Sequence, residues 1–291
     1  MTTPIRSLAI STIGAAALAA GLVVSMASAA TTIVVTPTNT QGWSTADTRP
    51  GGAVNFIADA TAPAGIGALQ LTTSTTTTAK AQYMHAANTP LSAVTDLSYY
   101  TKQNSALFPG ADPSYQLPVF LNGTAGFSTL VFEPYQNPLQ GAVVPSTWQK
   151  WDVSGGLFWS TRTVTCSNGT IVGTPGGPAS YTLAQIKTLC PSAMVIGYGV
   201  NIGSNNPGYN VETDLFNFNG TVYNFELHNT PADKNQCKNG GYKNFTDALD
   251  QPFKNQGQCI KFVERLHDKD GDREDHHDGE QGDQPDTEND N

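Results

Sequence analysis

Between residues 31 and 227 the chain is a succession of short β-type runs separated by turn residues. Asn-Gly pairs, which favour tight hairpin turns, occur at 122–123, 168–169 and 219–220. The last pair joins two alternating runs, 214–218 and 221–225, so a hairpin is expected there. The expected strands are 32–35, 53–58, 68–73, 81–85, 97–102, 117–121, 129–132, 147–153, 157–163, 194–202, 211–218 and 221–227.

This pattern predicts an all-β fold, a two-sheet antiparallel sandwich of jelly-roll type over residues 31–228. One short helix is expected at 182–189, where Leu183, Ile186 and Leu189 recur at helical spacing. A parallel α/β sheet is disfavoured because most expected strands have no helix between them to make a crossover. Charged residues make up only 13% of the chain, which fits a β-rich extracellular domain.

The first thirty residues have the pattern of a signal peptide. Arg6 precedes an apolar run from 8 to 24, and small residues follow, so cleavage is expected after Ala29 or Ala30. The alternative is an uncleaved membrane anchor. It is disfavoured because the run is interrupted by polar residues and falls short of the ~20 apolar residues that a spanning helix needs. The sequence therefore predicts a secreted protein with no membrane association after cleavage.

Four cysteines fall in the mature chain, and four allow three pairings. None lies in a C-x-x-C motif, so neither thiol redox chemistry nor a zinc ribbon is indicated. In an oxidising compartment the simplest pairing is Cys166 with Cys190 and Cys237 with Cys259, each closing a short loop.

Several segments of the predicted sandwich carry a resemblance to known domains. They are "APAGIGALQL" at 62–71, "LSYYTKQ" at 97–103, "STWQKWDVSGGLFWST" at 146–161, "MVIGYGVNIGSN" at 194–205 and "DLFNFNGTVYNFE" at 214–226. Together they resemble a group of secreted bacterial β-sandwich domains of unassigned function. The resemblance implies the fold and secretion, and it brings no catalytic residues.

The C-terminal part is expected to form two further regions. Residues 232–265, with "CKNGG" and "FKNQGQC", resemble a small cysteine-paired module of secreted bacterial proteins, and two short strands clipped by the second disulfide are expected. Residues 266–291 form an acidic, His-containing tail that is expected to be disordered. Asp268, Asp270 and Asp272 in this tail imitate the start of a calcium loop, but Arg273 and Gly279 break the pattern.

The sequence contains few catalytic signals. A net charge of −9 argues against nucleic-acid binding, and no nucleophile elbow, zinc-binding helix or phosphate-binding loop is present. Glu212 and Asp214 would share one strand face and are the only candidate catalytic pair for glycoside cleavage. The competing interpretation is a polar strand end or a structural cation site. No cofactor is therefore expected, although a structural calcium ion is possible.

Aromatic residues offer a binding hypothesis. On the strand expected at 147–153, Trp148 shares a face with Lys150 and Asp152, whereas Trp151 faces the other way. An exposed indole beside two charged groups could stack on a sugar ring, so these three residues are the candidate ligand site. Trp151 and Trp159 are expected in the core, and Trp43 in a loop.

Three functions remain open from the sequence. The first is a secreted, non-enzymatic β-sandwich that binds carbohydrate or matrix, with extracellular polysaccharide or the cell-surface matrix as partner. The second is a polysaccharide-active hydrolase or lyase. The third is a structural extracellular module without a small ligand.

Overall fold

The computed structural model describes residues 30–249 and 251–271. The predicted signal segment up to residue 29 and the acidic tail from 272 onward lie outside the described residues. Asp272 lies outside them as well, and the side chains of Asp268 and Asp270 are not described.

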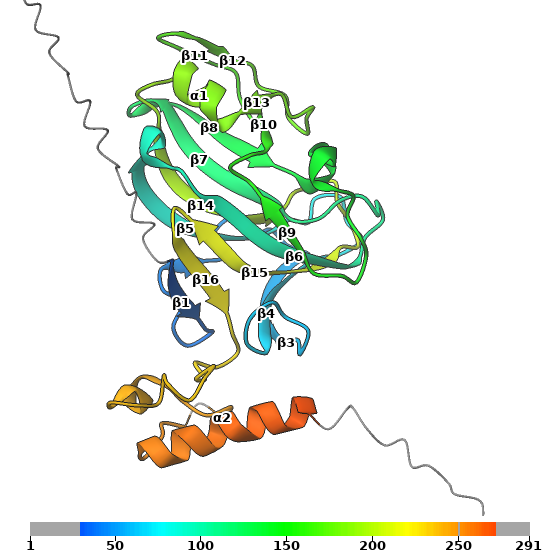
Figure 1. Cartoon of the computed structure of the whole chain (residues 1–291). Helices are drawn as coiled ribbons and strands as arrows, with labels where there is room; N and C mark the ends of the chain where they lie inside the picture. The colour runs from blue at the N-terminus through cyan, green and yellow to red at the C-terminus, as the bar shows by residue number, and fades with distance from the viewer. Residues whose placement is uncertain (1–29, 250, 272–291) are drawn as a thin grey trace, which may run out of the picture.

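Two seven-stranded sheets stack as a sandwich, as the sequence predicts (Figure 1). We call the first the β15 sheet. It holds β1 (Thr31–Val35), β16 (Thr221–Phe225), β15 (Asn210–Phe218), β4 (Gly67–Thr73), β3 (Gly52–Ala58), β6 (Leu97–Ser105) and β9 (Gln149–Asp152). β15 pairs with β6 along one side and with β4 and β16 along the other. The pairing in this sheet is antiparallel except between β1 and β16, which run parallel.

The second layer, the β14 sheet, has the strand order β13-β10-β8-β7-β14-β5-β2. Its strands are β13 (Tyr181–Thr182), β10 (Leu157–Ser160), β8 (Ala125–Phe132), β7 (Ser114–Asn122), β14 (Met194–Ile202), β5 (Ala81–Pro90) and β2 (Trp43–Ser44). A separate hairpin, β11 (Val164–Cys166) with β12 (Gly169–Ile171), turns through Ser167 and Asn168, because Gly169 already pairs with Cys166. The other two Asn-Gly pairs also form their predicted turns, between β7 and β8 and between β15 and β16.

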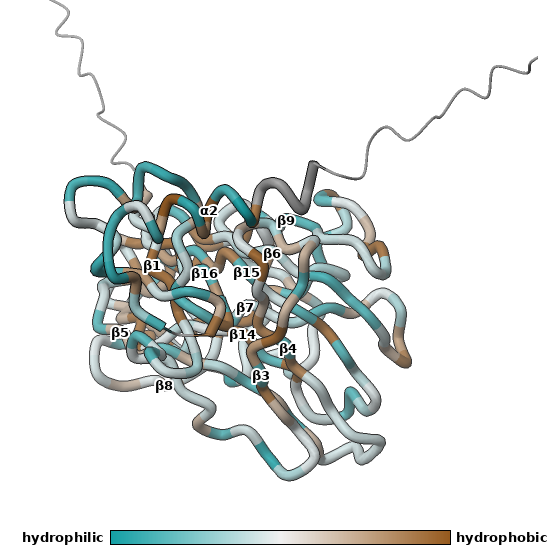
Figure 2. The backbone as a smooth tube through the Cα atoms, turned by 90° about the horizontal axis from the view of Figure 1, so that it is seen from below, coloured by the Kyte–Doolittle hydropathy of each residue, from teal (hydrophilic) through white to brown (hydrophobic). Residues whose placement is uncertain are grey.

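The core lies between the two sheets and is rich in aromatic rings. Tyr115 of β7 stacks on Phe216 of β15 with ring centroids 4.3 Å apart, which ties the layers together. Trp43, predicted in a loop, is only 3% exposed in β2 and contacts Phe216 and Tyr83. The prediction was wrong because a strand of two residues has no periodicity to reveal it. In Figure 2 hydrophobic stretches gather among the strands, as beside β6 and β15, and most outer loops are pale or hydrophilic.

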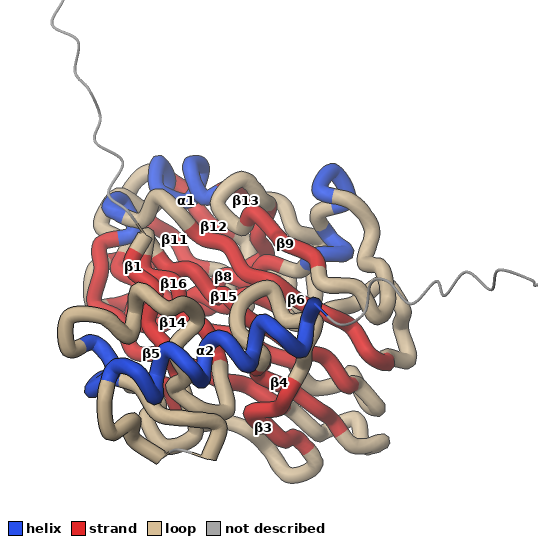
Figure 3. The backbone as a smooth tube through the Cα atoms, turned by 60° about the horizontal axis from the view of Figure 1, so that its bottom comes forward, coloured by secondary structure: helices blue, strands red, loops and turns tan. Residues whose placement is uncertain are grey.

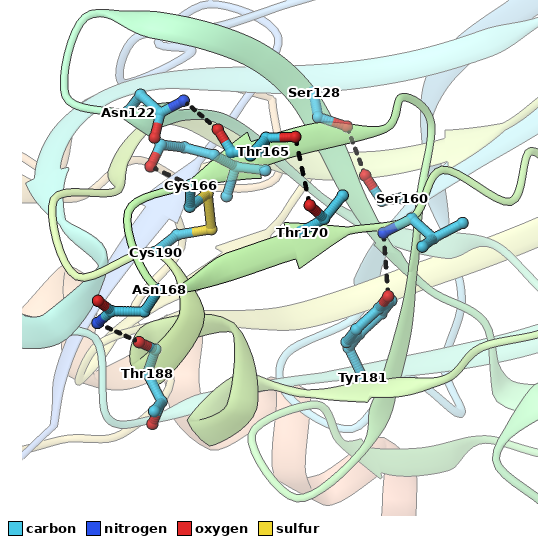
Figure 4. The surroundings of a disulfide bond; sticks show 12 residues. Asn122, Ser128, Ser160, Thr165, Cys166, Asn168, Thr170, Tyr181, Thr188 and Cys190 are labelled. Atoms are coloured by element: carbon cyan, nitrogen blue, oxygen red, sulfur yellow. Dashed lines mark hydrogen bonds between the residues drawn. A yellow bond between two sulfur atoms is a disulfide. The ribbon is translucent and has the colours of Figure 1, made fainter.

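The predicted helix forms as α1 (Leu183–Leu189), and it begins with a capping box. The Thr182 hydroxyl accepts from the Gln185 backbone N–H, and the Gln185 side chain accepts from the Thr182 backbone N–H. At its other end Cys190 is bonded to Cys166 of β11, as predicted. Figure 4 shows this disulfide holding the β11–β12 hairpin beside α1.

The C-terminal module differs from the expectation. Its disulfide, Cys237–Cys259, is as predicted, but the chain forms a short helix η4 (Gly241–Asn244) and a long helix α2 (Gln256–Gly271) instead of two strands. One helix was expected in the whole chain, and the described residues form two α-helices. The missed signal is helical: Cys259 and Val263, four residues apart, are both fully buried.

α2 also runs past residue 265, so residues 266–271 of the predicted tail are helical. Asn255, just before the helix, accepts a hydrogen bond from the Gln258 backbone N–H and caps it. The helix lies across the end of the sandwich where β16 leaves it (Figures 1 and 3). Among the described residues, no helix has the length and apolar character required to span a bilayer.

Candidate functional site

A groove of about 700 Å³ lies on the outer face of the β14 sheet. Strand alternation places its lining residues. Gln116 and Pro118 of β7 face the groove, whereas the residues that alternate with them, Tyr115, Leu117 and Val119, are fully buried in the core. The same alternation holds in β10, where Trp159 lines the groove and Phe158 is fully buried.

The strand register aligns one row of residues across the floor of this groove. Met84 of β5 lies opposite Gly199 of β14, which lies opposite Gln116 of β7. Gln116 lies opposite Val131 of β8, and Val131 lies opposite Trp159 of β10. Four strand spacings of ~4.8 Å make the row about 19 Å long. Gly199 keeps its middle flat, because a Cβ there would lie 2.2 Å from the Tyr83 carbonyl oxygen.

Exposed aromatic rings concentrate at this groove. In the described part of the chain, three aromatic side chains are more than a third exposed: Phe108, Phe127 and Tyr135. All three line the groove, and Phe108 packs edge-on against Tyr135 with ring centroids 5.5 Å apart. Large apolar rings left in water at one concave surface are typical of a ligand site.

Trp159 is held in place by the carboxyl group of Glu133. Its Nε1–H donates to Glu133 Oε2 over 2.7 Å, and the Gln136 side chain donates to the same oxygen. Burial raises the pKa of Glu133, although these hydrogen bonds oppose the shift. The indole is therefore fixed in orientation while one side of it lines the groove.

A second carboxyl group, Asp112, lies in the groove just before β7. Only 6% of it is exposed, and its Oδ1 has no hydrogen-bond partner. Thr101 donates to the other oxygen and itself accepts from Trp151 Nε1 in the core. Burial raises the pKa of Asp112 to about 7, because ionising the carboxyl in this site is unfavourable.

The candidates predicted from the sequence lie elsewhere, on the outer face of the β15 sheet. Trp148 is half-buried, its Nε1–H donates to Asp59 over 3.0 Å, and Lys102 Nζ lies 5.3 Å from its ring centroid. Lys150 and Asp152 are exposed on the neighbouring β9, and Lys150 lies over the Tyr100 ring.

Glu212 belongs to the same charged cluster. Lys102 makes ion pairs with both Asp59 and Glu212, which brings the predicted catalytic residue within reach of the predicted binding residue. Although burial alone would raise the pKa of Asp59, the Lys102 hydrogen bond holds it well below its usual range. The charges of Asp59, Lys102 and Glu212 are therefore paired with one another.

Asp214, the other half of the predicted pair, is fully buried. It accepts a hydrogen bond from the Phe225 backbone N–H over 3.0 Å. Burial raises the pKa of Asp214 well above its usual range. Neither Asp214 nor Glu212 lines the groove.

Trp159 is the main residue that sequence reasoning misplaced. It was expected in the core, but Phe158 occupies that position, so the face of this strand was assigned one residue out of register. The missing information was the pairing of β10 with β8, which sets Trp159 opposite Val131. Among the residues that the structure describes, no group of three or more His, Cys, Asp or Glu side chains could hold a metal ion.

No protein-family model matches the sequence, and no curated protein does. Among solved structures, the chain is similar to a family 11 carbohydrate-binding module from Clostridium thermocellum, in complex with a mixed-linked tetrasaccharide. That match has 12% identity and a TM-score of 0.36, and it covers 62% of this chain and 91% of the module.

A CBM22-1 xylan-binding domain from Paenibacillus barcinonensis matches with 16% identity and a TM-score of 0.33, over 62% of this chain and 86% of that domain. An arabinose-bound α-L-arabinofuranosidase matches at 6% identity and a TM-score of 0.36, over 65% of this chain and 26% of the enzyme. At these values no ligand and no residue role transfers to this chain.

Proposed function

We propose that this protein is a secreted, non-enzymatic β-sandwich that binds polysaccharide in the groove of the β14 sheet. The observation that carries the proposal is the gathering of exposed aromatic rings at one groove with an aligned floor. Flat sugar faces stack on such rings, and the groove's amide and hydroxyl groups suit sugar hydroxyls.

Secretion is part of the proposal. It is supported by the two disulfides, which persist in oxidising compartments, and by the resemblance to secreted bacterial sandwich domains. Extracellular polysaccharide or cell-surface matrix is the corresponding partner.

The test combines a glycan array with two matched tryptophan variants. Trp159 and Trp148 are both half-buried indoles that donate to a carboxylate, but Trp159 lies in the β14 sheet and Trp148 lies just before β9 of the β15 sheet. We expect Trp159→Ala to weaken binding by ~1–3 kcal/mol, by analogy with other stacking on aromatic rings. Trp148→Ala should leave binding unchanged.

Two results would contradict this assignment. If Trp148→Ala abolishes binding and Trp159→Ala does not, the ligand binds at Trp148, Lys150 and Asp152, the site expected from the sequence. If no polysaccharide binds, the protein is a structural module without a small ligand.

A polysaccharide-active enzyme is the second candidate, and one observation favours it. Asp112, with a pKa of about 7, and Glu133 both line the groove, so one could hold a proton near neutrality while the other is ionised. A reducing-sugar release assay on the polysaccharides that bind distinguishes the two. Release that Asp112→Asn abolishes would establish the enzyme, with these residues in place of Glu212 and Asp214.

A further inference from the structure

The groove carries its positive charge at one end. Among its described lining residues, Arg49 and Lys80 are the only Arg or Lys side chains, and they are neighbours through an isolated antiparallel bridge. The Arg49 backbone N–H donates to the Lys80 carbonyl oxygen over 2.9 Å, which fixes the two residues side by side. Arg49 Nη1 also donates to the Ser204 hydroxyl over 2.9 Å, which holds the guanidinium at the groove.

These two cations are only partly neutralised. Burial lowers the pKa of Lys80, the nearby Arg49 lowers it further, and Asp47 opposes the shift. One carboxylate therefore faces two like charges that repel each other. An anionic group between Arg49 and Lys80 would relieve this repulsion and accept charge-assisted hydrogen bonds from both.

Apart from Asp47, the acidic groups of the groove lie at a distance from this pair. Lys80 directly precedes β5, Asp112 lies just before β7, and Glu133 directly follows β8. In the strand order β5-β14-β7-β8, these positions are two and three strand spacings from β5, or about 10 and 14 Å. Trp159 lies one strand further, on β10. The charge therefore changes along the groove. Arg49 and Lys80 make one end basic, Asp112 and Glu133 are the acidic groups of the middle, and Trp159 lies at the other end.

We propose that the ligand is an acidic polysaccharide, bound in one orientation with a sugar carboxylate between Arg49 and Lys80 and uncharged sugar rings at the Trp159 end. This inference rests on the proposed function of the groove. A carboxylate on every sugar would place one against Glu133, where like charges repel. The chemistry therefore favours a mainly neutral chain that carries spaced carboxylates over a polyuronate.

The experiment uses the full chain and matched pairs of polymers. Glucuronoxylan, xanthan and pectin are each compared with a carboxyl-reduced form, in which the acid groups have become neutral alcohols on the same backbone. We expect glucuronoxylan or xanthan to bind more tightly than pectin, which is a polyuronate, and carboxyl reduction of the polymer that binds to weaken its binding about tenfold at pH 7. Raising NaCl from about 50 to about 500 mM should weaken only the acidic form.

Three variants locate the effect. Arg49→Gln and Lys80→Gln should each weaken binding of the acidic polymer about fivefold to tenfold and leave the reduced polymer unaffected. Lys150→Gln removes the same charge from an exposed residue on the other sheet and should change neither. Trp159→Ala should weaken both forms, because stacking does not depend on the carboxylate.

The outcomes separate this inference from the proposed function. Equal affinity for acidic and reduced polymers, or binding confined to neutral or sulfated polymers, overturns the carboxylate site and leaves the groove as a sugar-binding site. A loss with Lys150→Gln and none with Arg49→Gln moves the anion site to the β15 sheet and overturns it too. No binding to any polymer overturns both proposals.

Discussion

Asp214 and Glu226 are two buried carboxyl groups held against the same loop, residues 62–67. The Ala64 backbone N–H donates to Asp214, and the Ile66 N–H donates to Glu226 Oε2 over 3.3 Å. Asp214 Oδ2 and Glu226 Oε1 have no hydrogen-bond partner, and neither residue is more than 4% exposed. Two ionised carboxylates in such a site would repel each other strongly, so one of them is expected to keep a proton.

This arrangement makes the stability depend on pH. Burial raises the pKa of Glu226 from its ordinary value of 4.5 to about 7, and the charge on Asp214 is linked to it. The folded protein then holds a proton that the unfolded chain releases, so the free energy of unfolding falls as pH rises between about 4.5 and 7. We expect the melting temperature to decrease over this window, and Glu226→Gln to flatten the decrease.

A control is needed because Asp112 also has a pKa near 7 and shifts stability in the same direction. Asp112→Asn should remove only its own share of the slope, whereas Glu226→Gln should also lower the pKa of Asp214 by removing the neighbouring charge. An unchanged slope in Glu226→Gln would show that the pair does not titrate. If calcium chloride raises the melting temperature at pH 8 and EDTA reverses it, a cation balances the pair instead of a proton.

A second prediction concerns the glycine at the centre of the same loop. Gly65 has φ +66°, and a Cβ built there would lie 1.6 Å from Glu226 Oε1. Gly123 has a similar φ of +71° but nothing within 4 Å. Both alanine variants pay the strain of a left-handed backbone, ~1 kcal/mol, but Gly65→Ala must also displace a buried carboxyl group.

Chemical denaturation of the two variants measures this difference. We expect Gly65→Ala to lose ~1–3 kcal/mol more than Gly123→Ala, since overpacking adds to the backbone strain. Equal losses would mean that the Glu226 carboxyl moves aside at little cost and that the loop does not fix it. Where Gly65→Ala is the less stable of the two, the double variant Gly65→Ala with Glu226→Ala should recover part of that difference, because the carboxyl group that meets the new Cβ is gone.

Much of the fold follows from local pattern. The hairpin at Asn219-Gly220 forms as predicted because both residues take positive φ, 54° and 86°, which the type I′ turn requires. α1 forms where apolar residues recur at helical spacing, and both disulfides join cysteines close in sequence. The C-terminal helix was missed because glycines and asparagines obscured the helical spacing of Cys259 and Val263, which are both buried.

The groove could not be predicted in the same way, because it depends on register between strands far apart in sequence. Trp159 lines the groove because β10 pairs with β8 at Val131, and nothing within the strand's own four residues states which face is buried. Asp112 and Arg49 lie outside the predicted strands, so alternation does not place them. Trp148 was conspicuous in the sequence because charged neighbours surround it, but its partners come from distant parts of the chain, Asp59 just after β3 and Lys102 in β6.

The last prediction compares the two tryptophans near β9. Trp151 is fully buried and donates from Nε1 to Thr101 over 2.7 Å, whereas Trp148 is half-buried against Lys102. Trp151→Ala should cost ~3–5 kcal/mol of unfolding free energy, because it leaves a large cavity and removes the hydrogen bond that the Thr101 hydroxyl accepts. Trp148→Ala should cost ~1 kcal/mol, the value of one partly exposed hydrogen bond and a cation–π contact. Denaturation of both variants decides the matter, and a larger loss in Trp148→Ala would mean that the two faces of this strand are the reverse of those described.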